Sequence, residues 1–372
     1  MTDPAEILRQ LIAVPSVNPR ERPEAAETPL AEHVARWAQE RGMVAELTPV
    51  RDGRCNVTVT LPGDSEEIVL LESHLDTVEV DGMAVDPFEM TVTDGRAYGR
   101  GTCDAKGQLA VFMAAMERVA ARGRPSRTVV LAGVVDEEHL YVGVQALRAR
   151  LPRPPVVAIV GEPTSLRLVV AHKGCMRCRI TAHGDAGHSS APWGRRNSIA
   201  LAGEVVAYLQ SASYQDALAA REQPLVGPPS LAVTLIEGGT APNVLPESCT
   251  ITIDRRTVPG EDPHEVWREI AQDLEARWPG VVEVAEPHIV DYALGAATSS
   301  ELDALADVLG RHDLPTEPVG VGHGSDASKL ALDGIPCAVF GAGSIAQAHT
   351  ADEHVPLAEL ETACAVITDF IR

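Results

Sequence analysis

The run Ile68-Val69-Leu70-Leu71 is followed by "ESHLDTV" at residues 72–78. Successive apolar residues of this kind are typical of a strand buried on both faces of a sheet. Just beyond the run, the imidazole of His74 and the carboxylate of Asp76 stand two residues apart. Residues i and i+2 of an extended chain point to the same side, so Asp76 can hydrogen-bond one ring nitrogen of His74 and leave the other for a metal ion. A single His-x-Asp is weak support, so the neighbouring strand ends matter.

The first 170 residues around this strand alternate between helical and strand patterns. Continuous apolar strands separated by helices predict an α/β sheet that is covered by helices on both faces. The predicted strands are 55–61, 68–72, 128–135 and 156–161, and the predicted helices are 4–13, 29–42, 106–122 and 140–151.

The pattern changes near Gly174 to alternating strands and two long amphipathic helices, near 197–221 and 262–277. This is typical of an α+β sheet with one open face. From about residue 297 the first pattern returns, with helices at 299–310 and 325–332 and a buried strand in "CAVFGAG". We therefore predict one domain of residues 1–173 and 289–372, with a second domain of residues 174–288 inserted into it.

The composition limits the classes of partner. The 53 acidic and 31 basic residues give a net charge of −22, which opposes binding to nucleic acid or to an anionic membrane surface. No run approaches the roughly 20 apolar residues of a membrane span, and the N-terminus is unlike a secretory signal. Seven cysteines, an odd number, fit a reducing compartment, and the Cys175-x-x-Cys178 pair lies in a predicted strand, which favours a structural role. These features predict a soluble, cytoplasmic protein.

Other strand ends and loops of the first domain also carry side chains that bind metals. In open α/β sheets ligands bind outside the carboxyl ends of the strands, so residues far apart in sequence can converge there. The candidates are Asp104 in "GRGTCDAKG" (99–107), Glu137 and Glu138 in "VVDEEH" (134–139), Glu162 in "VVAIVGEPT" (156–164) and His349 in "VFGAGSIAQAHTADEH" (339–354).

Each candidate has an ordinary structural alternative. Asp104 can cap a helix, and Glu137 and Glu138 can complement a helix dipole. Glu162 can be a turn residue, and His349 a surface histidine. Considered together, three carboxylates and two imidazoles with one bridging candidate supply a nitrogen and a terminal oxygen to each of two cations, a ligand set suited to zinc or a similar divalent metal.

Seven motifs spread over nearly the whole chain resemble the M20 family of metallopeptidases and deacylases. The resemblance implies a zinc-exopeptidase-like catalytic domain with an inserted, ferredoxin-like lid domain, and a homodimer formed through the lid. The motifs are "SHLDTV", "YGRGTCDAKG", "DEE", "GEPT", "GHSSAPWGRRNSI", "GGTAPNVLPESCTITIDRRTVPG" and "QAHTADEHV".

The resemblance also implies roles for the metal-site residues. Asp104 would bridge two divalent metals, with zinc favoured and cobalt as the alternative. His74 and Glu162 would complete one site, and Glu138 and His349 the other. Asp76 would orient His74, Glu137 would be the general base, and a cis peptide would follow Asp104.

The resemblance extends to substrate-binding residues. His188 would stabilise the oxyanion, Asn243 and Arg256 would bind a substrate carboxylate, and Gly341 and Gly343 would present backbone N–H groups. Read from the residues alone, His188 is a loop histidine and Arg256 forms a salt bridge at a strand end.

The expected activity is hydrolysis of an amide bond in an N-acyl amino acid or short peptide, closest to acetylornithine deacetylation. The alternatives are a succinyl-diaminopimelate desuccinylase, a carboxypeptidase acting on acyl-glutamates, a small peptidase, and a non-catalytic binding protein on the same scaffold. One departure stands out: "HLYVG" (139–143) follows the acidic pair where the family usually has small residues, and the role of His139 stays open.

Overall fold

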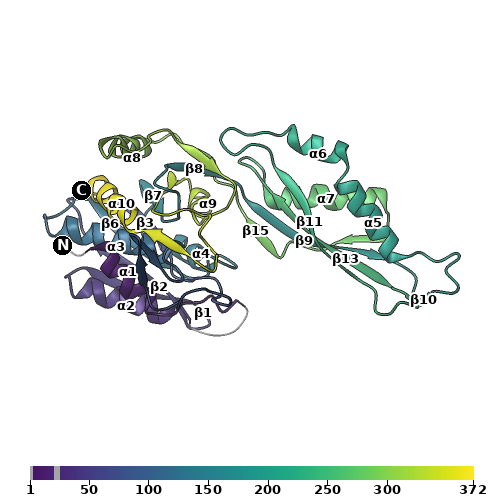
Figure 1. The fold of residues 1–372 in the computed structure, drawn as a ribbon. Helices are drawn as coiled ribbons and strands as arrows, with labels where there is room; N and C mark the ends of the chain where they lie inside the picture. The colour runs from purple at the N-terminus through teal and green to yellow at the C-terminus, as the bar shows by residue number, and fades with distance from the viewer. Residues whose placement is uncertain (1–2, 21–25) are drawn as a thin grey trace. The chain divides into compact units, whose positions relative to one another are not determined.

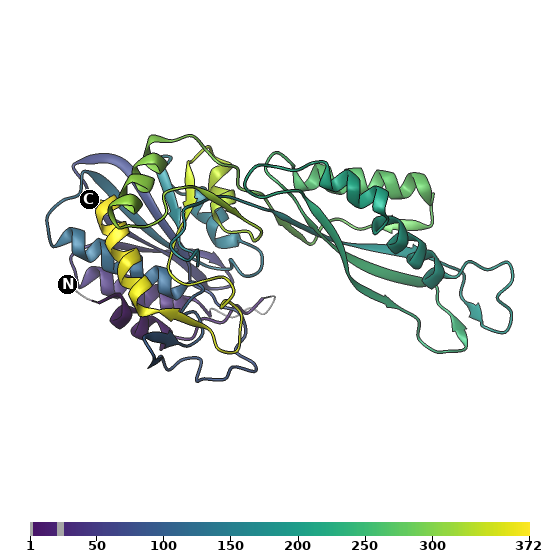
Figure 2. The same cartoon turned by 45° about the horizontal axis from the view of Figure 1, so that its top comes forward.

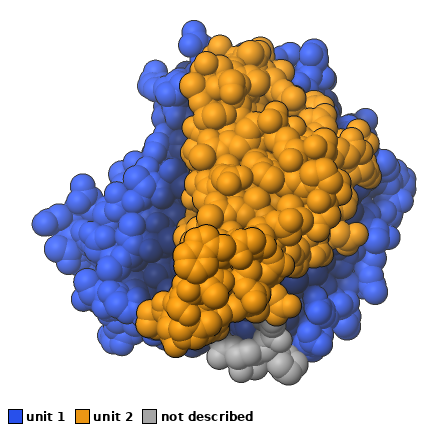
Figure 3. Space-filling model, turned by 90° about the vertical axis from the view of Figure 1, so that its right-hand side faces the viewer, with its two compact units in different colours: residues 1–170, 296–319, 325–372 blue, residues 171–295, 320–324 orange. Residues whose placement is uncertain are grey.

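A computed structural model describes residues 3–20 and 26–372, which fold as two compact units (Figure 3). Unit 1 comprises residues 1–170, 296–319 and 325–372, and unit 2 comprises residues 171–295 and 320–324. Each unit has its own cluster of buried apolar side chains. The segment that forms unit 2 is thus almost entirely an insertion between two strands of the sheet of unit 1.

The centre of unit 1 is an eight-stranded sheet in the order β1-β2-β6-β3-β7-β17-β8-β16 (Figure 1). Strand β3 pairs in parallel with β6 and β7, and β17 pairs in parallel with β7, so these four strands end at the same edge. The bounds are β1 Val44–Arg51, β2 Arg54–Leu61, β3 Ser65–His74, β6 Arg127–Val134, β7 Val157–Val160, β8 Val169–His172, β16 Val319–Val321 and β17 Cys337–Val339.

Helices cover both faces of this sheet, as the sequence predicted (Figure 2). Side chains alternate along β3, so that Val69 and Leu71 join the large apolar cluster while Ile68 faces α4. Helices α1, α3 and α10 pack against one another, whereas α4 and α9 pack together. The bounds are α1 Pro4–Ile12, α2 Thr28–Gln39, α3 Lys106–Ala120, α4 Val142–Arg148, α8 Ser300–Arg311, α9 Ala327–Ala331 and α10 Leu357–Phe370. A small sheet of β4 Thr91–Thr93, β5 Arg96–Tyr98 and β18 His354–Pro356 completes the unit.

Unit 2 is a βαββαβ fold with the helices on one face of an antiparallel sheet. The sheet order β11-β13-β9-β14 is that of a ferredoxin-like domain, and alternate residues of β9 and β13 are buried. The predicted sheet with one open face is therefore confirmed. The bounds are β9 Cys175–His183, β10 Gly187–His188, α5 Ser198–Leu209, α6 Ala212–Ala219, β11 Ser230–Gly238, β12 Val244–Leu245, β13 Ser248–Arg256, α7 Pro263–Arg277, β14 Val282–Val284 and β15 Ile289–Asp291.

Two predicted helices differ from the structure. The helix predicted at 197–221 is two helices, because the Ser211 hydroxyl accepts a hydrogen bond from the N–H of Tyr214 and starts α6 as a new helix. The helix predicted at 140–151 is only the seven residues of α4, since Tyr141 has a left-handed backbone (φ 61°) and cannot belong to it. Apolar periodicity alone does not reveal either interruption.

Cys175 and Cys178 lie on β9 as expected, and all seven cysteines are free. Within the described residues, none of the helices combines the length and apolar character needed to span a lipid bilayer.

Candidate metal centre

His74 is the last residue of β3 and is buried at the edge where the parallel strands end. Its Nδ1 atom lies 2.9 Å from the backbone oxygen of Asp76, and its Nε2 atom lies 2.9 Å from Oδ1 of Asp104. Glu162, two residues beyond β7, places Oε1 3.8 Å from the same Nε2 atom. The parallel register of β3 and β7 therefore brings His74 and Glu162 together.

Asp104 lies in the loop that opens α3, and the peptide bond to Ala105 is cis, as expected. The loop is held by the buried carboxylate of Glu353, which accepts hydrogen bonds from the backbone N–H groups of Gly101, Cys103 and Asp104 at 2.9–3.1 Å. Arg100 forms an ion pair with the same carboxylate at 2.7 Å. Glu353 thus fixes the backbone that carries Asp104.

The two oxygens of Asp104 face two different histidines. While Oδ1 meets His74, Oδ2 lies 3.3 Å from Nε2 of His349, and that nitrogen is 3.0 Å from Oε1 of Glu138. The carboxylate therefore stands between a His74–Glu162 pair and a His349–Glu138 pair. His74, Asp104 and Glu138 each place one donor atom within 4.8 Å of the others.

Glu137 and Glu138 follow β6 and are oriented through their backbones. The N–H of Glu137 donates to Oδ1 of Asp76 at 3.1 Å, and the N–H of Glu138 donates to Oδ2 at 3.0 Å. The side chain of Asn18 donates a third hydrogen bond to this carboxylate at 2.7 Å. One buried carboxylate thus fixes the start of the acidic turn.

This arrangement changes the predicted contact between Asp76 and His74. The Asp76 carboxylate is 3.7 Å from Nδ1 of His74, whereas the Asp76 carbonyl oxygen is 2.9 Å away. The prediction assumed an extended chain through Asp76, but β3 ends at His74. The backbone of Asp76 therefore makes the close contact, and its side chain holds the acidic turn.

Electrostatics in the cluster follow from burial and crowding. Burial raises the pKa of Glu137 to about 8, with repulsion from Glu138 and Asp104 adding to it. Burial also raises the pKa of Glu138, and raises that of Glu162 well above its ordinary value. Burial alone would raise the pKa of Asp104 as well, yet hydrogen bonds with His349 and His74 hold it below its usual range. Hydrogen bonds with Asp104 and Glu138 raise the pKa of His349 to about 10.

The donor set fits divalent cations. Carboxylates crowded in this way repel one another unless protons or cations lie among them. Two imidazole nitrogens turn toward a shared carboxylate, and the other nitrogen of His74 is held by a backbone carbonyl, which is how metal-ligating histidines are oriented. Nitrogen and carboxylate donors together suit zinc and similar metals.

The predicted substrate residues His188, Asn243 and Arg256 lie in unit 2. His188 is exposed, and its Nδ1 atom lies 2.7 Å from the hydroxyl of Ser190. Its strand, β10, pairs with β12, and Asn243 is the residue immediately before β12. Arg256 ends β13 and donates to both carboxylate oxygens of Asp254, at 2.8 and 3.3 Å. The strand-end salt bridge anticipated as its structural alternative is therefore present.

The N–H groups of Gly341 and Gly343 are engaged inside unit 1, contrary to the expectation that they would be presented to a substrate. Gly341 donates to the hydroxyl of Thr164 at 3.1 Å, and Gly343 donates to the carboxylate of Glu359 at 2.8 Å. Binding a substrate through them would require breaking these bonds. The glycines instead allow close packing, because a Cβ on Gly341 would overlap the side chain of Gln108.

The sequence reasoning missed several supporting residues. Glu353 lies four residues after His349 in the quoted "QAHTADEHV" motif, so proximity to a candidate ligand was an available signal. Asn18 bonds both Asp76 and Asp136, and Asp136 is also paired with buried Arg54 at 2.9 Å. No local pattern marks these contacts, because the partners lie between 58 and 118 residues apart.

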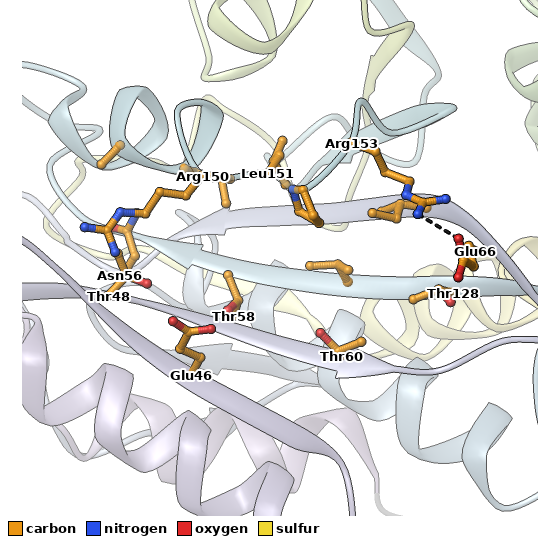
Figure 4. Close-up of a pocket in the computed structure, with 15 residues that line it drawn as sticks. Glu46, Thr48, Asn56, Thr58, Thr60, Glu66, Thr128, Arg150, Leu151 and Arg153 are labelled. Atoms are coloured by element: carbon orange, nitrogen blue, oxygen red, sulfur yellow. Dashed lines mark hydrogen bonds and ion pairs between the residues drawn. The ribbon is translucent and has the colours of Figure 1, made fainter.

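A separate pocket of about 390 Å³ lies on the sheet of unit 1 beneath α4 (Figure 4). Its floor carries threonines from β1, β2 and β6, and Arg153 at its rim is paired with Glu66 at 2.7 Å. None of the predicted metal ligands lines it. The acid–imidazole chemistry therefore resides at the carboxyl ends of the strands and not in this pocket.

An α/β unit with an acid–imidazole cluster at the ends of its parallel strands has the architecture of a metal-dependent hydrolase. Peptidase family M20/M25/M40 matches residues 70–372, and the chain belongs to this family. The acetylornithine deacetylase of Proteus mirabilis strain HI4320 is 32% identical over 368 residues, covering 96% of this chain and 92% of the relative.

Solved structures share the fold. An M20 family metallo-carboxypeptidase, Sso-CP2 from Sulfolobus solfataricus, has a TM-score of 0.79 at 18% identity, covering 100% of this chain and 99% of the other. The YXEP protein of Bacillus subtilis, a dinuclear metal-binding peptidase of the M20 family, has a TM-score of 0.72 at 16% identity, covering 99% and 96%. The chain is a metal-dependent hydrolase of amide bonds.

Proposed function

We propose that this enzyme removes the acyl group from an N-acyl amino acid, with acetylornithine as the first candidate substrate. One observation carries the proposed chemistry: each oxygen of Asp104 faces a different histidine, and each histidine has its own glutamate nearby. In this proposal Asp104 would be shared by two divalent metals, with His74 and Glu162 holding one and Glu138 and His349 holding the other. Zinc suits these donors, with cobalt as the alternative.

The proposal also assigns a catalytic role to several residues. Bound divalent metals would supply Lewis acidity, making a water acidic and polarising the substrate carbonyl. Glu137 accepts the proton from that water and delivers it to the leaving nitrogen. Its carboxylate is buried beside the candidate metal-binding residues, where a positioned base can move a proton between water and the leaving group. Asp76 holds Glu137 in place through the backbone, and His188 stabilises the developing oxyanion.

The choice of substrate rests on the 32% identity to an acetylornithine deacetylase along nearly the whole chain. A hydrolysis panel would contain N-acetylornithine, N-succinyl-diaminopimelate, an acyl-glutamate and a dipeptide. We expect kcat/KM for N-acetylornithine to exceed the others by about tenfold or more, which corresponds to about 1.4 kcal/mol of transition-state discrimination. A preference for the dipeptide would make the protein a peptidase and overturn this assignment.

The adjacent glutamates allow a matched test of the metal-site roles. We expect Glu137→Gln to keep its full metal content and lose about 10²- to 10⁴-fold in kcat, the usual range for removal of a positioned general base. Glu138→Gln changes the neighbouring side chain in the same way, yet it should lose bound metal. Metal content would be measured by atomic emission after dialysis, and equal metal content in both variants would contradict the assignment.

Two further features of the molecule support proposals on assembly and location. Strand β11 is an edge strand of the sheet of unit 2 and exposes Leu235 and Ile236, which supports pairing of two copies through this unit. The seven free cysteines support a reducing compartment such as the cytoplasm. Sedimentation of the purified protein would test the dimer.

A further inference from the structure

The turn that carries Glu137 and Glu138 ends at Tyr141. Its first half is fixed by the carboxylate of Asp76, which accepts both glutamate N–H groups. At its far end, Tyr141 has a left-handed backbone, and its N–H donates to the carbonyl oxygen of Asp136 at 2.7 Å. The position of the acidic pair therefore depends on whatever holds Tyr141.

The ammonium group of Lys329 lies over the ring of Tyr141, 3.6 Å from the ring centroid. Lys329 belongs to α9, and only 3% of its surface is exposed. Such a cation–π contact is stronger when it is shielded from water than when it is exposed. The contact joins two segments, β6–α4 and α9, that are almost 190 residues apart in sequence.

Lys329 is itself held in place by its surroundings. Its ammonium group donates to the carbonyl oxygen of Ser325 at 3.0 Å and lies 3.9 Å from the carboxylate of Asp326. Asp326 and Glu72 are both buried, and within the part of the chain that the structure describes their carboxylate oxygens have no hydrogen-bond partner. Moving the ammonium group away would break its hydrogen bond to Ser325 and its contact with Asp326, both of which are buried.

The choice of residue type is informative as well. The chain contains three lysines and 28 arginines, so arginine fills basic positions almost by default. A compact ammonium group suits this buried position, where it donates to the carbonyl oxygen of Ser325 and lies near the carboxylate of Asp326. Tyr141, in turn, supplies the ring that Lys329 contacts, and it belongs to "HLYVG" (139–143), the segment that departs from the small residues usual after the acidic pair.

We propose that Lys329 and Tyr141 form a clamp that positions Glu137 for proton transfer. Both are positioning residues, because neither belongs to the metal-binding set, and the inference rests on the proposed function of Glu137 as general base. The clamp acts on the second half of the turn and Asp76 on the first. Loss of the clamp would loosen the turn, while Glu138, the metal-binding member of the acidic pair, stays tied to His349 at 3.0 Å.

Tyr141→Leu and Tyr141→Phe test the clamp as a matched pair. The phenylalanine keeps the aromatic face and should retain kcat within about twofold. The leucine removes the face, and we expect kcat to fall about 10- to 100-fold, the effect of a misplaced catalytic group. KM and metal content should be unchanged, which a general loss of structure would not produce. The measurements use the panel substrate that the unmodified protein hydrolyses fastest, and an equal loss in both variants, or full kcat in folded Tyr141→Leu, would overturn the clamp.

A double-mutant cycle with Lys329→Met adds a second test. If the two residues act together, the double variant should lose no more kcat than Tyr141→Leu alone. If the double variant instead loses kcat by the product of the two single losses, the residues act independently and the proposal is overturned. If Lys329→Met does not fold, the comparison of Tyr141→Leu with Tyr141→Phe still tests the clamp.

Arg41→Met is the control, because it removes the cation–π contact between Arg41 and Trp37 in the same unit. This variant should leave kcat unchanged. Glu137→Gln separates the two proposals. Full activity in Glu137→Gln would refute the role of Glu137 as general base. Loss of activity in Glu137→Gln together with full activity in Tyr141→Leu would refute only the clamp.

Discussion

Asp76 shows how one buried side chain can organise a whole site. Its carboxylate accepts hydrogen bonds from Asn18 and from the backbones of Glu137 and Glu138, while its own carbonyl oxygen contacts His74. Burial raises the pKa of Asp76, yet the neighbouring His74 and the hydrogen bonds from Asn18 and the N–H of Glu138 hold it below its usual value. Asp76 thus positions both the imidazole of His74 and the acidic pair, which explains why a His-x-Asp at a strand end can support a metal site.

His349 provides a pH prediction for the metal-free protein. Hydrogen bonds with Asp104 and Glu138 raise its pKa to about 10, above the unfolded value of about 6.5. A raised folded pKa gives stability that is fully present below about pH 6.5 and is lost as pH rises through about 10. A metal ligand must be deprotonated, so the same proton competes with the metal. We expect metal affinity to rise from pH 6 to pH 8, with protons released on binding.

Titration calorimetry in two buffers of different ionisation enthalpy would count the released protons at each pH. His312, which contacts Asp369 at 3.0 Å on the surface of unit 1, offers a matched control. His312→Gln should keep the affinity and its pH dependence, whereas His349→Gln should weaken binding and reduce the proton count. Affinity that does not vary between pH 6 and pH 8 would contradict the proposed role of His349.

At the scale of elements, the start of α3 and the Asp104 loop are packed backbone to backbone. The N–H of Gly107 donates to the carbonyl oxygen of Gly101 at 3.2 Å, and a Cβ on Gly107 would overlap the carbonyl oxygen of Thr102. We expect Gly107→Ala to shift this loop and to lower the free energy of unfolding by about 1–3 kcal/mol, the usual cost of overpacking. Metal affinity should fall about 10- to 100-fold, as it does when the support of a ligand is disturbed.

Gly203 in α5 makes the control for Gly107. It is exposed, and an added Cβ meets nothing within 4 Å, so Gly203→Ala should leave metal affinity unchanged. Because alanine has a higher helix propensity than glycine, the substitution should raise the free energy of unfolding by about 0.5–1 kcal/mol. Chemical denaturation and metal titration of both variants would check this, and a Gly107→Ala protein with unaltered metal affinity would show that the loop does not depend on this packing.

The strands that carry the site could be predicted from the sequence because their signal is local. Four apolar residues before His74 indicate a buried strand, and the rule that ligands gather at carboxyl ends of parallel strands groups His74 with Glu162. The partners of each side chain could not be predicted, since they come from tertiary contacts. Asn18 on Asp76 and Glu359 on Gly343 are examples, and in the second case the N–H group that was predicted to bind substrate donates to a carboxylate of unit 1.

At the scale of the molecule, the core is divided between the two units. The larger apolar cluster contains only residues of unit 1, such as Leu71 and Phe112, and the smaller contains only residues of unit 2, such as Ile253 and Leu274. Cooperative unfolding follows the extent of a continuous core, so two separate cores favour two unfolding transitions. All five candidate metal ligands belong to unit 1.

Calorimetry of the full chain should therefore show two transitions, of which only one responds to metal. A ligand stabilises the state that binds it, by about 2.7 kcal/mol at a free concentration 100 times Kd, so chelation should lower the transition of unit 1 and leave the other in place. Ile253→Ala, which removes a buried side chain from the core of unit 2 at a cost of about 2–5 kcal/mol, should lower the other transition alone. A single transition that moves with both chelation and Ile253→Ala would show that the two cores unfold as one, and that stability gained at the metal site extends to the inserted unit.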